Sequence, residues 1–206
     1  MNNKHRYYNQ PGRITEPNWK SYVVKTTDEP VFTPEQCNKI IDTGRSQPKR
    51  TGKIGITSNE EAYNTDTRLS HISWIPFGML EPMYRQLETV MHNTNKNHFG
   101  FDNMQLTEEA QYTEYKDGGF YGWHMDSAVN FESGNSPVRK ISMSLLLNHE
   151  SEFEVCELEL IVECIIAYIK QGHAIFFASF LQHRVKPVTK GLRKSLVMWF
   201  GGTPFK

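Results

Sequence analysis

Three residues of this chain have side chains that could form a metal site, although one of them lies far from the other two in the sequence. His124 and Asp126 are separated by one residue, so in an extended segment both side chains point to the same side of the backbone. His183 lies 57 residues after Asp126, behind the apolar run 174–177. Two imidazoles and one carboxylate form the ligand set that binds non-haem Fe(II) and leaves coordination positions open. We refer to these three residues as the candidate triad.

An arginine follows the last member of the triad at a distance that suits anion binding. Arg193 lies ten residues after His183, and Ser195 comes two residues later. A guanidinium on the adjacent strand can bind the far carboxylate of a dicarboxylic acid through two parallel hydrogen bonds. The other end of such a ligand, a 2-oxo acid, would then bind the metal and leave a position for dioxygen.

Two helices are predicted in the first half of the chain, and they must support the site. Thr33 and Gln36 form a capping box with Pro34 at the first helical position, so a helix is expected to begin there and to end near Gly44. A second helix is predicted over residues 78–95, where apolar side chains recur at helical spacing. Its apolar stripe indicates a helix that faces the core.

Short strands dominate the second half of the chain. The segments with strand-like patterns, each bounded by turn residues, are 111–115, 141–147, 158–162, 174–177 and 195–200. Two further strands are predicted earlier, over 22–26 and 69–75. Many short strands at such spacing are typical of a sandwich or a barrel. The sequence therefore predicts a mainly β fold with supporting α-helices.

A single domain is expected to contain all of these elements. Residues 1–20 are polar and turn-rich, which predicts a flexible N-terminal arm. Residues 21–103 are expected to form a helical supporting layer, and residues 104–206 the β core. The polar loops 45–67 and 127–138 are expected to flank the metal and to form a lid over the substrate.

Composition argues against several classes of protein. The 206 residues include 23 basic and 23 acidic side chains, so the formal net charge is zero and no global field attracts nucleic acid or an anionic membrane. No apolar run approaches the ~18 residues that span a bilayer, and no secretory signal is evident at the start. The three cysteines have no metal-binding spacing and are expected to be reduced thiols, which predicts a cytoplasmic location.

Further motifs surround the candidate triad. Tyr115 stands nine residues before His124, the run 183–199 reads HRVKPVTKGLRKSLVMW, and Arg139 precedes the apolar segment 141–148. Together with the triad, these elements resemble the iron(II)/2-oxoglutarate-dependent dioxygenases, and in particular their prolyl 4-hydroxylase-like branch. The resemblance covers the chain from Tyr112 to the C-terminus, whereas the N-terminal helices fit it only as a supporting layer.

The resemblance implies a fold and a set of roles. The fold would be a double-stranded β-helix, or jelly roll, with the N-terminal helices packed on its outer face. The candidate triad would bind Fe(II), and 2-oxoglutarate and dioxygen would be the co-substrates. Arg193 would pair with the distal carboxylate of 2-oxoglutarate, Tyr115 would donate a hydrogen bond to it, and Ser195 would assist. Arg139 and Trp199 are candidates for substrate contact, with an exposed or a core role as the alternative.

The substrate expected from the resemblance is a prolyl or other side chain of a peptide or protein. A free amino acid or another small metabolite is the alternative, and no pocket residue distinguishes the two. Nucleic-acid demethylation uses the same triad but needs a second arginine well downstream of the metal histidine, and only Arg184 and Arg193 follow His183. A non-catalytic jelly-roll binding module is also conceivable, but such a module needs no convergent metal ligands.

Two departures from the family pattern concern the surroundings of the site. Val155 and Cys156 stand where the family usually has two glycines, and Ala178 stands where it usually has proline. A β-branched residue and a cysteine do not share the freedom of glycine to take positive φ, so the turn is expected to differ. Neither departure touches a candidate ligand, and both are expected to affect the shape of the substrate entrance.

Overall fold

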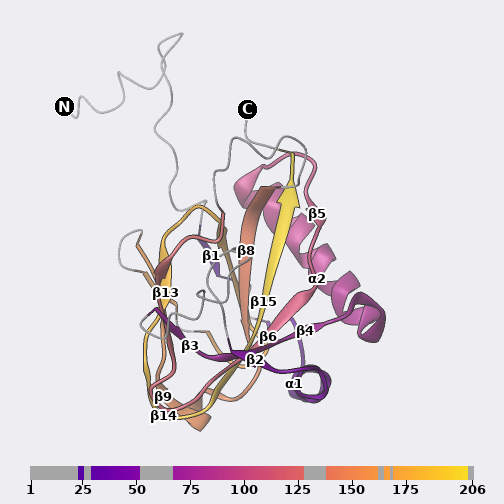
Figure 1. Ribbon diagram of the computed structural model, residues 1–206. Coiled ribbons are helices and arrows are strands. Elements are labelled where there is room, and N and C mark those ends of the chain that lie inside the picture. Colours follow the sequence, from indigo (N-terminus) through magenta and orange to yellow (C-terminus); the bar gives the residue numbers. More distant parts are fainter. Residues whose placement is uncertain are drawn as a thin grey trace, which may run out of the picture.

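The protein is described by a computed structural model that covers residues 23–25, 29–51, 67–127, 138–161, 165–167 and 169–203 (Figure 1). The predicted N-terminal arm, residues 1–20, lies outside the described residues, and so do most of the predicted lid loops 45–67 and 127–138. In the part of the chain that is described, no helix is both long enough and apolar enough to cross a membrane.

Both predicted helices are present. Helix α1 spans Pro34–Ser46, and Thr33 caps it through the predicted capping box: Gln36 N–H donates to Thr33 Oγ1, and Thr33 N–H donates to Gln36 Oε1. Helix α2 spans Glu81–Thr94, between a 3-10 turn (η4, Phe77–Met79) and a π-helical turn (η5, Asn95–Phe99). The amphipathic stripe therefore predicted the position of α2 well. Helix α1 ends two residues beyond Gly44, where its end was predicted.

The larger of the two main sheets is antiparallel and packs against the helices. Its strand order is β1-β12-β8-β15-β6-β4-β2, and β5 pairs with the far end of β15. The strands are β1 (Val23–Lys25), β2 (Arg50–Thr51), β4 (His71–Ile75), β5 (Gln105–Leu106), β6 (Ala110–Tyr115), β8 (Val138–Leu146), β12 (Ala174–Ala178) and β15 (Arg193–Gly202).

The smaller sheet faces the larger one from the side opposite the helices, and its order is β11-β10-β13-β7-β3 (Figure 1). Its strands are β3 (Arg68–Leu69), β7 (Phe120–His124), β10 (Leu158–Leu160), β11 (Ile165–Ala167) and β13 (His183–Val185). A separate pair joins β9 (Phe153–Val155), which follows the 3-10 turn η6 (Glu150–Glu152), to β14 (Val188–Gly191). The segment 21–103 thus supplies strands β1 to β4 to both sheets as well as the two helices.

The two faces of the larger sheet have different compositions, as β15 illustrates. Leu196, Met198 and Phe200 are fully buried in one apolar cluster with residues of α1 and α2. Because side chains alternate along a strand, Arg193 and Ser195 lie on the opposite face, toward the smaller sheet. Helix α1 packs closely on the first face, since a Cβ on Gly44 would lie 2.4 Å from Tyr112 Cγ. The polar inner face is therefore held in place by an apolar layer behind it.

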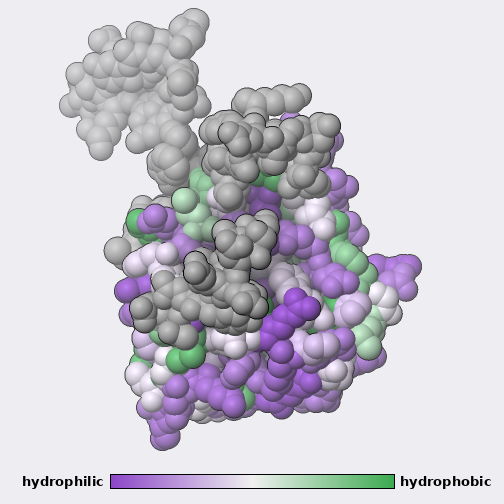
Figure 2. All heavy atoms as spheres, viewed as in Figure 1, coloured by the Kyte–Doolittle hydropathy of each residue, from purple (hydrophilic) through white to green (hydrophobic). Residues whose placement is uncertain are grey.

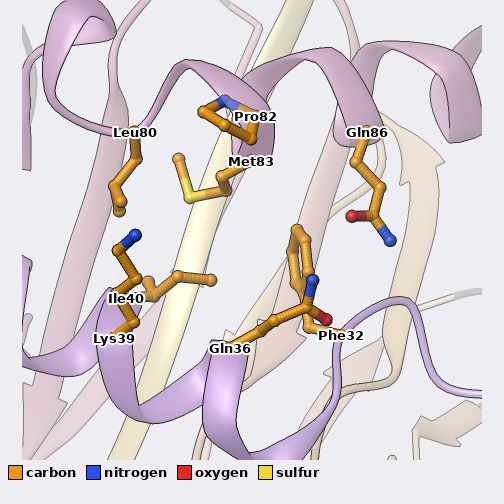
Figure 3. Close-up of a pocket in the computed structure, with 8 residues that line it drawn as sticks. All are labelled: Phe32, Gln36, Lys39, Ile40, Leu80, Pro82, Met83 and Gln86. Atoms are coloured by element: carbon orange, nitrogen blue, oxygen red, sulfur yellow. The ribbon is translucent and has the colours of Figure 1, made fainter.

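The helix layer contains a pocket that lies away from the candidate triad. On the face shown in Figure 2, most coloured residues are hydrophilic and the hydrophobic ones are scattered, as is normal for a globular protein. A pocket of about 130 Å³ opens between α1 and α2 (Figure 3). Its lining residues are Phe32, Gln36, Lys39, Ile40, Leu80, Pro82, Met83 and Gln86. This pocket belongs to the helix side of the larger sheet, away from the candidate triad.

The turn between β9 and β10 contradicts one expectation from the sequence. Val155 and Cys156 have φ values of 61° and 71°, so both adopt the left-handed backbone that glycine favours. The expectation that this turn would avoid such a backbone is wrong. Val155 is the last residue of β9 and pairs with Val188, and Cys156 is buried in the apolar cluster between the sheets. Strand pairing and burial therefore hold the turn against the local preference of both residues.

We expect the Val155→Gly variant to be more stable than the natural protein. The left-handed backbone costs a residue with a Cβ atom about 1–2 kcal/mol, and the greater freedom of glycine in the unfolded chain offsets about half of that gain. Val155 is 45% exposed, so its side chain loses few contacts. Urea unfolding should show a gain of about 0.5–1 kcal/mol. Glu154→Gly, one residue earlier and without positive φ, should be destabilised, and an equal loss in both variants would contradict the assignment of strain.

Candidate metal centre

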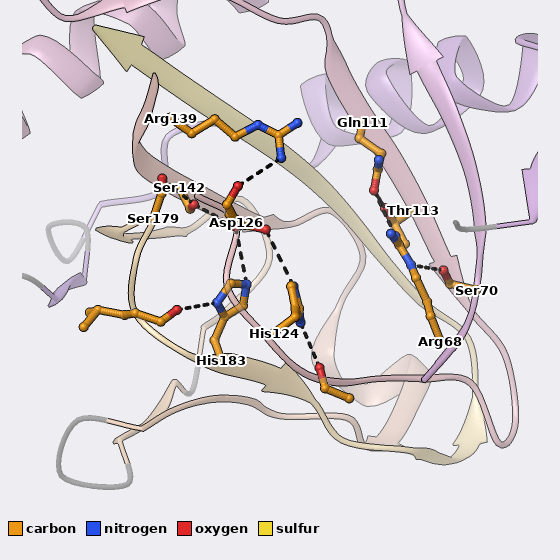
Figure 4. Close-up of polar contacts among 12 residues, drawn as sticks. Arg68, Ser70, Gln111, Thr113, His124, Asp126, Arg139, Ser142, Ser179 and His183 are labelled. Carbon is orange, nitrogen blue, oxygen red and sulfur yellow. Dashed lines mark hydrogen bonds and ion pairs between the residues drawn. The ribbon is translucent and has the colours of Figure 1, made fainter. Parts of the chain in front are cut away.

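The fold brings the candidate triad together at one end of the smaller sheet (Figure 4). His124 ends β7 and His183 begins β13, and the two residues are direct partners in the antiparallel register of these strands. Asp126 follows two residues after His124, with Oδ1 3.6 Å from His124 Nε2 and Oδ2 3.4 Å from His183 Nε2. One donor atom from each residue lies within 4.8 Å of the others. That spacing permits all three to bind one ion.

A β-bulge turns His124 toward the site. In the pairing of β7 with β13, Tyr121 is opposite Val185 while His124 is opposite His183, so three steps on β7 match two on β13. The extra residue puts Tyr121 and His124 on the same face, where their rings stack with centroids 3.5 Å apart. The bulge thus re-aims a side chain that regular alternation would place elsewhere.

Main-chain carbonyls fix the proton of each imidazole. His124 Nδ1 lies 2.8 Å from the carbonyl oxygen of Gly122, and His183 Nδ1 lies 3.0 Å from that of Leu181. A carbonyl oxygen only accepts hydrogen bonds, so each Nδ1 carries the proton and donates it. Nε2 of both rings is therefore left available as the metal-binding atom.

The protonation states of two triad members also suit a cation. Burial and, to a smaller extent, the nearby His183 lower the pKa of His124 to about 4, so the His124 ring is neutral at neutral pH. Burial raises the pKa of Asp126, but the nearby imidazoles of His183 and His124 and the hydrogen bond from Ser142 outweigh it and hold the pKa of this carboxyl below its usual range. A neutral imidazole and a carboxylate are the forms that bind metal ions without first losing a proton.

Arg193 lies on the inner face of the larger sheet. Its partner in the register is Tyr115 on β6, and its guanidinium lies 5.8 Å from the centre of the Tyr115 ring. The side chain is 2% exposed, and Nη1 donates to Ser195 Oγ at 3.1 Å. In the described part of the chain, no Asp or Glu forms an ion pair with Arg193. A buried guanidinium without an anionic partner is costly, so an anion is expected to bind there.

Arg139 and Trp199, the candidates for substrate contact, lie together beside the triad. The Arg139 guanidinium stacks over the Trp199 ring at 4.0 Å, and its Nη1 donates to the main-chain oxygen of Asp126 at 3.4 Å. Glu108 holds the same guanidinium in an ion pair through two hydrogen bonds. Trp199 is 6% exposed, and its indole N–H has no acceptor among the described residues. Both side chains therefore contact other residues of the site rather than solvent alone.

Several residues of the site were not identified from the sequence, and Arg68 is the most prominent. It is the partner of Tyr121 in the pairing of β3 with β7, and its guanidinium lies 4.4 Å above the Tyr121 ring. Arg68 Nε donates to Ser70 Oγ, and Nη2 donates to Gln111 Oε1. The only signal in the sequence is an arginine at the edge of a predicted strand, and that pattern usually indicates an exposed residue.

The antiparallel sheets, with a His-Asp-His cluster between them and a buried arginine on the larger one, define a class of protein. Residues 110–201 match the family model described as the 2OG-Fe(II) oxygenase superfamily. A PKHD-type hydroxylase of Acidovorax ebreus is 33% identical over 93 residues, which are 43% of this chain and 41% of the relative. A PKHD-type hydroxylase of Aliarcobacter butzleri is 32% identical over 94 residues, with the same coverage. The match thus spans 41% of the length of each relative.

Solved structures confirm the predicted fold class. The viral collagen prolyl hydroxylase from Paramecium Bursaria Chlorella virus-1 matches with a TM-score of 0.67 and 17% identity, over 88% of this chain and 97% of that one. A Pseudomonas putida prolyl-4-hydroxylase matches with a TM-score of 0.64 and 17% identity, over 89% and 94% of the two chains. The fold is therefore the double-stranded β-helix of prolyl 4-hydroxylase-like oxygenases, with two helices on its outer face.

Proposed function

We propose that this protein is an Fe(II)- and 2-oxoglutarate-dependent hydroxylase that uses dioxygen. The observation that carries the proposal is Arg193, a buried guanidinium with no acidic partner in the described residues, on the sheet face that meets the triad. Such a cation beside two imidazoles and a carboxylate fits a ligand with a carboxylate at its far end. The match of residues 110–201 to the model of the 2OG-Fe(II) oxygenase superfamily supports the same function.

Different residues would bind the metal ion and the 2-oxoglutarate. His124, Asp126 and His183 would hold Fe(II), which when bound supplies the activation of dioxygen at the expense of 2-oxoglutarate. Arg193 would bind the distal carboxylate of 2-oxoglutarate, and the Ser195 hydroxyl would hold the guanidinium in position. Burial raises the pKa of Tyr115, so its phenol stays protonated and can donate a hydrogen bond to the same carboxylate.

We infer that the substrate is a prolyl or other side chain of a peptide or protein. Arg139 and Trp199 would form the wall that the peptide contacts. Glu108 fixes the Arg139 guanidinium before any substrate arrives, and this guanidinium stacks over the Trp199 ring. The names of the relatives, PKHD-type hydroxylases and prolyl hydroxylases, support this class of substrate.

One observation favours a smaller, anionic substrate as the second candidate. Arg68 is 6% exposed, and it donates hydrogen bonds to the neutral side chains of Ser70 and Gln111. No carboxylate in the described residues forms an ion pair with it. A substrate carboxylate would compensate this buried charge, as a free amino acid or another small organic acid could do.

Succinate formation across a substrate panel tests the proposal and separates its two versions. The panel should hold proline-containing peptides with amidated C-termini, the same peptides with free C-termini, and free amino acids, each with Fe(II) and 2-oxoglutarate. Turnover that depends on an amidated peptide supports the peptidyl substrate. Turnover confined to free carboxylates and lost in Arg68→Gln supports the small anionic one. Absence of 2-oxoglutarate binding in the metal-loaded protein would contradict both.

A further inference from the structure

We propose that Ser142 and Ser179 form a hydroxyl relay that positions the carboxylate of Asp126 for metal binding. This inference deepens the proposed function and rests on the metal centre that it assigns. Ser142 Oγ donates to Asp126 Oδ2 at 2.7 Å, and Ser179 Oγ lies 2.9 Å from Ser142 Oγ (Figure 4). Both serines are fully buried. They are positioning residues, since they act on the metal only through Asp126.

Asp126 needs such support because the strand ladder does not provide it. His124 and His183 lie on paired strands, and each ring is also tied to a carbonyl two residues earlier. Asp126 lies two residues beyond the end of β7, outside the register that pairs β7 with β13. Its carboxylate would otherwise rotate about its side-chain bonds, and each freely rotating group costs binding energy when a ligand orders it.

The direction of the two hydrogen bonds follows from the chemistry of the groups. A carboxylate only accepts, so the single hydroxyl proton of Ser142 goes to Asp126 Oδ2. Ser179 must then donate its own proton to Ser142 Oγ. Each bond polarises the next, so the hydroxyl of Ser179 strengthens the bond that Ser142 makes to the carboxylate. The relay binds Oδ2 of Asp126, and no hydroxyl of the described residues donates to Oδ1.

Ser179 also anchors the main chain around the triad. Its carbonyl oxygen accepts the N–H groups of Asp126 and Ser127, both at 3.0 Å, and its own N–H donates to the carbonyl of Lys140. Ser142 lies on β8 opposite Trp199, so its side chain is on the inner face of the larger sheet. The relay therefore connects the loop that carries Asp126 to β8 and to the residues just after β12. These two strands are neighbours in the rigid sheet.

A buried serine on the other face of the same sheet provides a matched control. Ser73 on β4 is 1% exposed, and its hydroxyl donates to the carbonyl of Gly44 at 2.6 Å. Ser73 pairs with Tyr112, which packs in the helix-side cluster rather than at the metal site. Ser73→Ala thus removes one buried hydroxyl and one hydrogen bond of that hydroxyl, as Ser179→Ala does, but at a distance from the triad.

The test measures Co(II) binding to the natural protein and to Ser142→Ala, Ser179→Ala, the double variant and Ser73→Ala. Co(II) alone is the probe, because it accepts the same nitrogen and oxygen ligands as Fe(II) and reports its geometry in the visible spectrum. Ser142→Ala should weaken Co(II) binding by about 10- to 100-fold and alter the visible bands. Ser179→Ala should have a smaller effect that disappears when Ser142 is already alanine. Ser73→Ala should lower the urea midpoint without changing the affinity.

The outcomes separate this inference from the metal site itself. If the natural protein binds Co(II) and Ser142→Ala binds it equally well with the same spectrum, the relay is overturned while the metal centre stands. Equal weakening in Ser73→Ala would also overturn it, because the effect would then be a general loss of stability. If Ser142→Ala does not fold, a weakened Ser179→Ala supports the relay and an unchanged one contradicts it. A natural protein that fails to bind Co(II) would overturn both proposals together.

Discussion

Changing His183 to alanine is expected to abolish both metal binding and turnover. His183 supplies one of two imidazoles, and its Nε2 lies 3.4 Å from Asp126 Oδ2, so its loss leaves one imidazole and one carboxylate. Outer partners of metal ligands typically contribute 10- to 100-fold to affinity, and loss of a ligand itself should exceed about 100-fold. Calorimetric titration with Co(II) and succinate formation with Fe(II) measure the two effects separately.

His92→Ala is the control for this prediction. His92 lies near the end of α2, is half exposed, and its Nε2 is 4.0 Å from Glu88. It has the same side chain but no contact with the triad, so Co(II) affinity and turnover should stay at the natural level. Full activity in His183→Ala would mean that the ligand assignment is incorrect, whatever the fold.

The triad could be proposed from the sequence because its residue types are restrictive and because the surrounding motifs resemble one family. The strand pairing that brings His124 opposite His183 could not, since it depends on the register of β7 against β13 and on the bulge beside Tyr121. A bulge is one extra residue in a short strand, and the amino-acid composition of the strand does not predict it. The identity of the ligands was thus predictable, whereas the register and the bulge that orient their side chains were not.

The supporting polar residues were missed for a related reason. Ser142 stands within an apolar strand segment, and a serine there usually indicates an ordinary strand residue. Its partners, Asp126 and Ser179, come from segments that are distant in the sequence and meet only in the folded sheets. Arg68 was missed in the same way, since its contacts with Tyr121 and Gln111 join three different strands. Hydrogen-bond networks of this kind form only in the tertiary structure, so local sequence patterns do not predict them.

Tertiary structure also overrode a local preference at the turn after β9. Glycine is the usual residue at positive φ, so Val155 and Cys156 predicted another backbone. The pairing of Val155 with Val188 and the burial of Cys156 instead hold both residues in the left-handed region. A rule based on propensity fails here because strand pairing and apolar burial together exceed the ~1–2 kcal/mol cost per residue.

The Arg193→Lys variant is expected to lose much of its affinity for 2-oxoglutarate while it keeps the positive charge. A guanidinium can donate two parallel hydrogen bonds to a carboxylate, and an ammonium acts as a point charge without that geometry. Loss of one hydrogen bond to a charged group costs about 1.5–3 kcal/mol. The 2-oxoglutarate concentration for half-maximal rate should therefore rise about 10- to 100-fold, with a smaller change in the maximal rate.

The location of Arg193 makes this prediction specific. Its guanidinium is buried beside Tyr115 and Ser195, so water cannot replace the missing donor as it would at the surface. Arg184→Lys is the matched control, because Arg184 forms a partly exposed ion pair with Glu159 on the smaller sheet. That exchange should leave the dependence on 2-oxoglutarate unchanged. If Arg193→Lys behaves like Arg184→Lys while Co(II) affinity is intact, the distal carboxylate binds elsewhere, and Arg68 becomes the next cation to test.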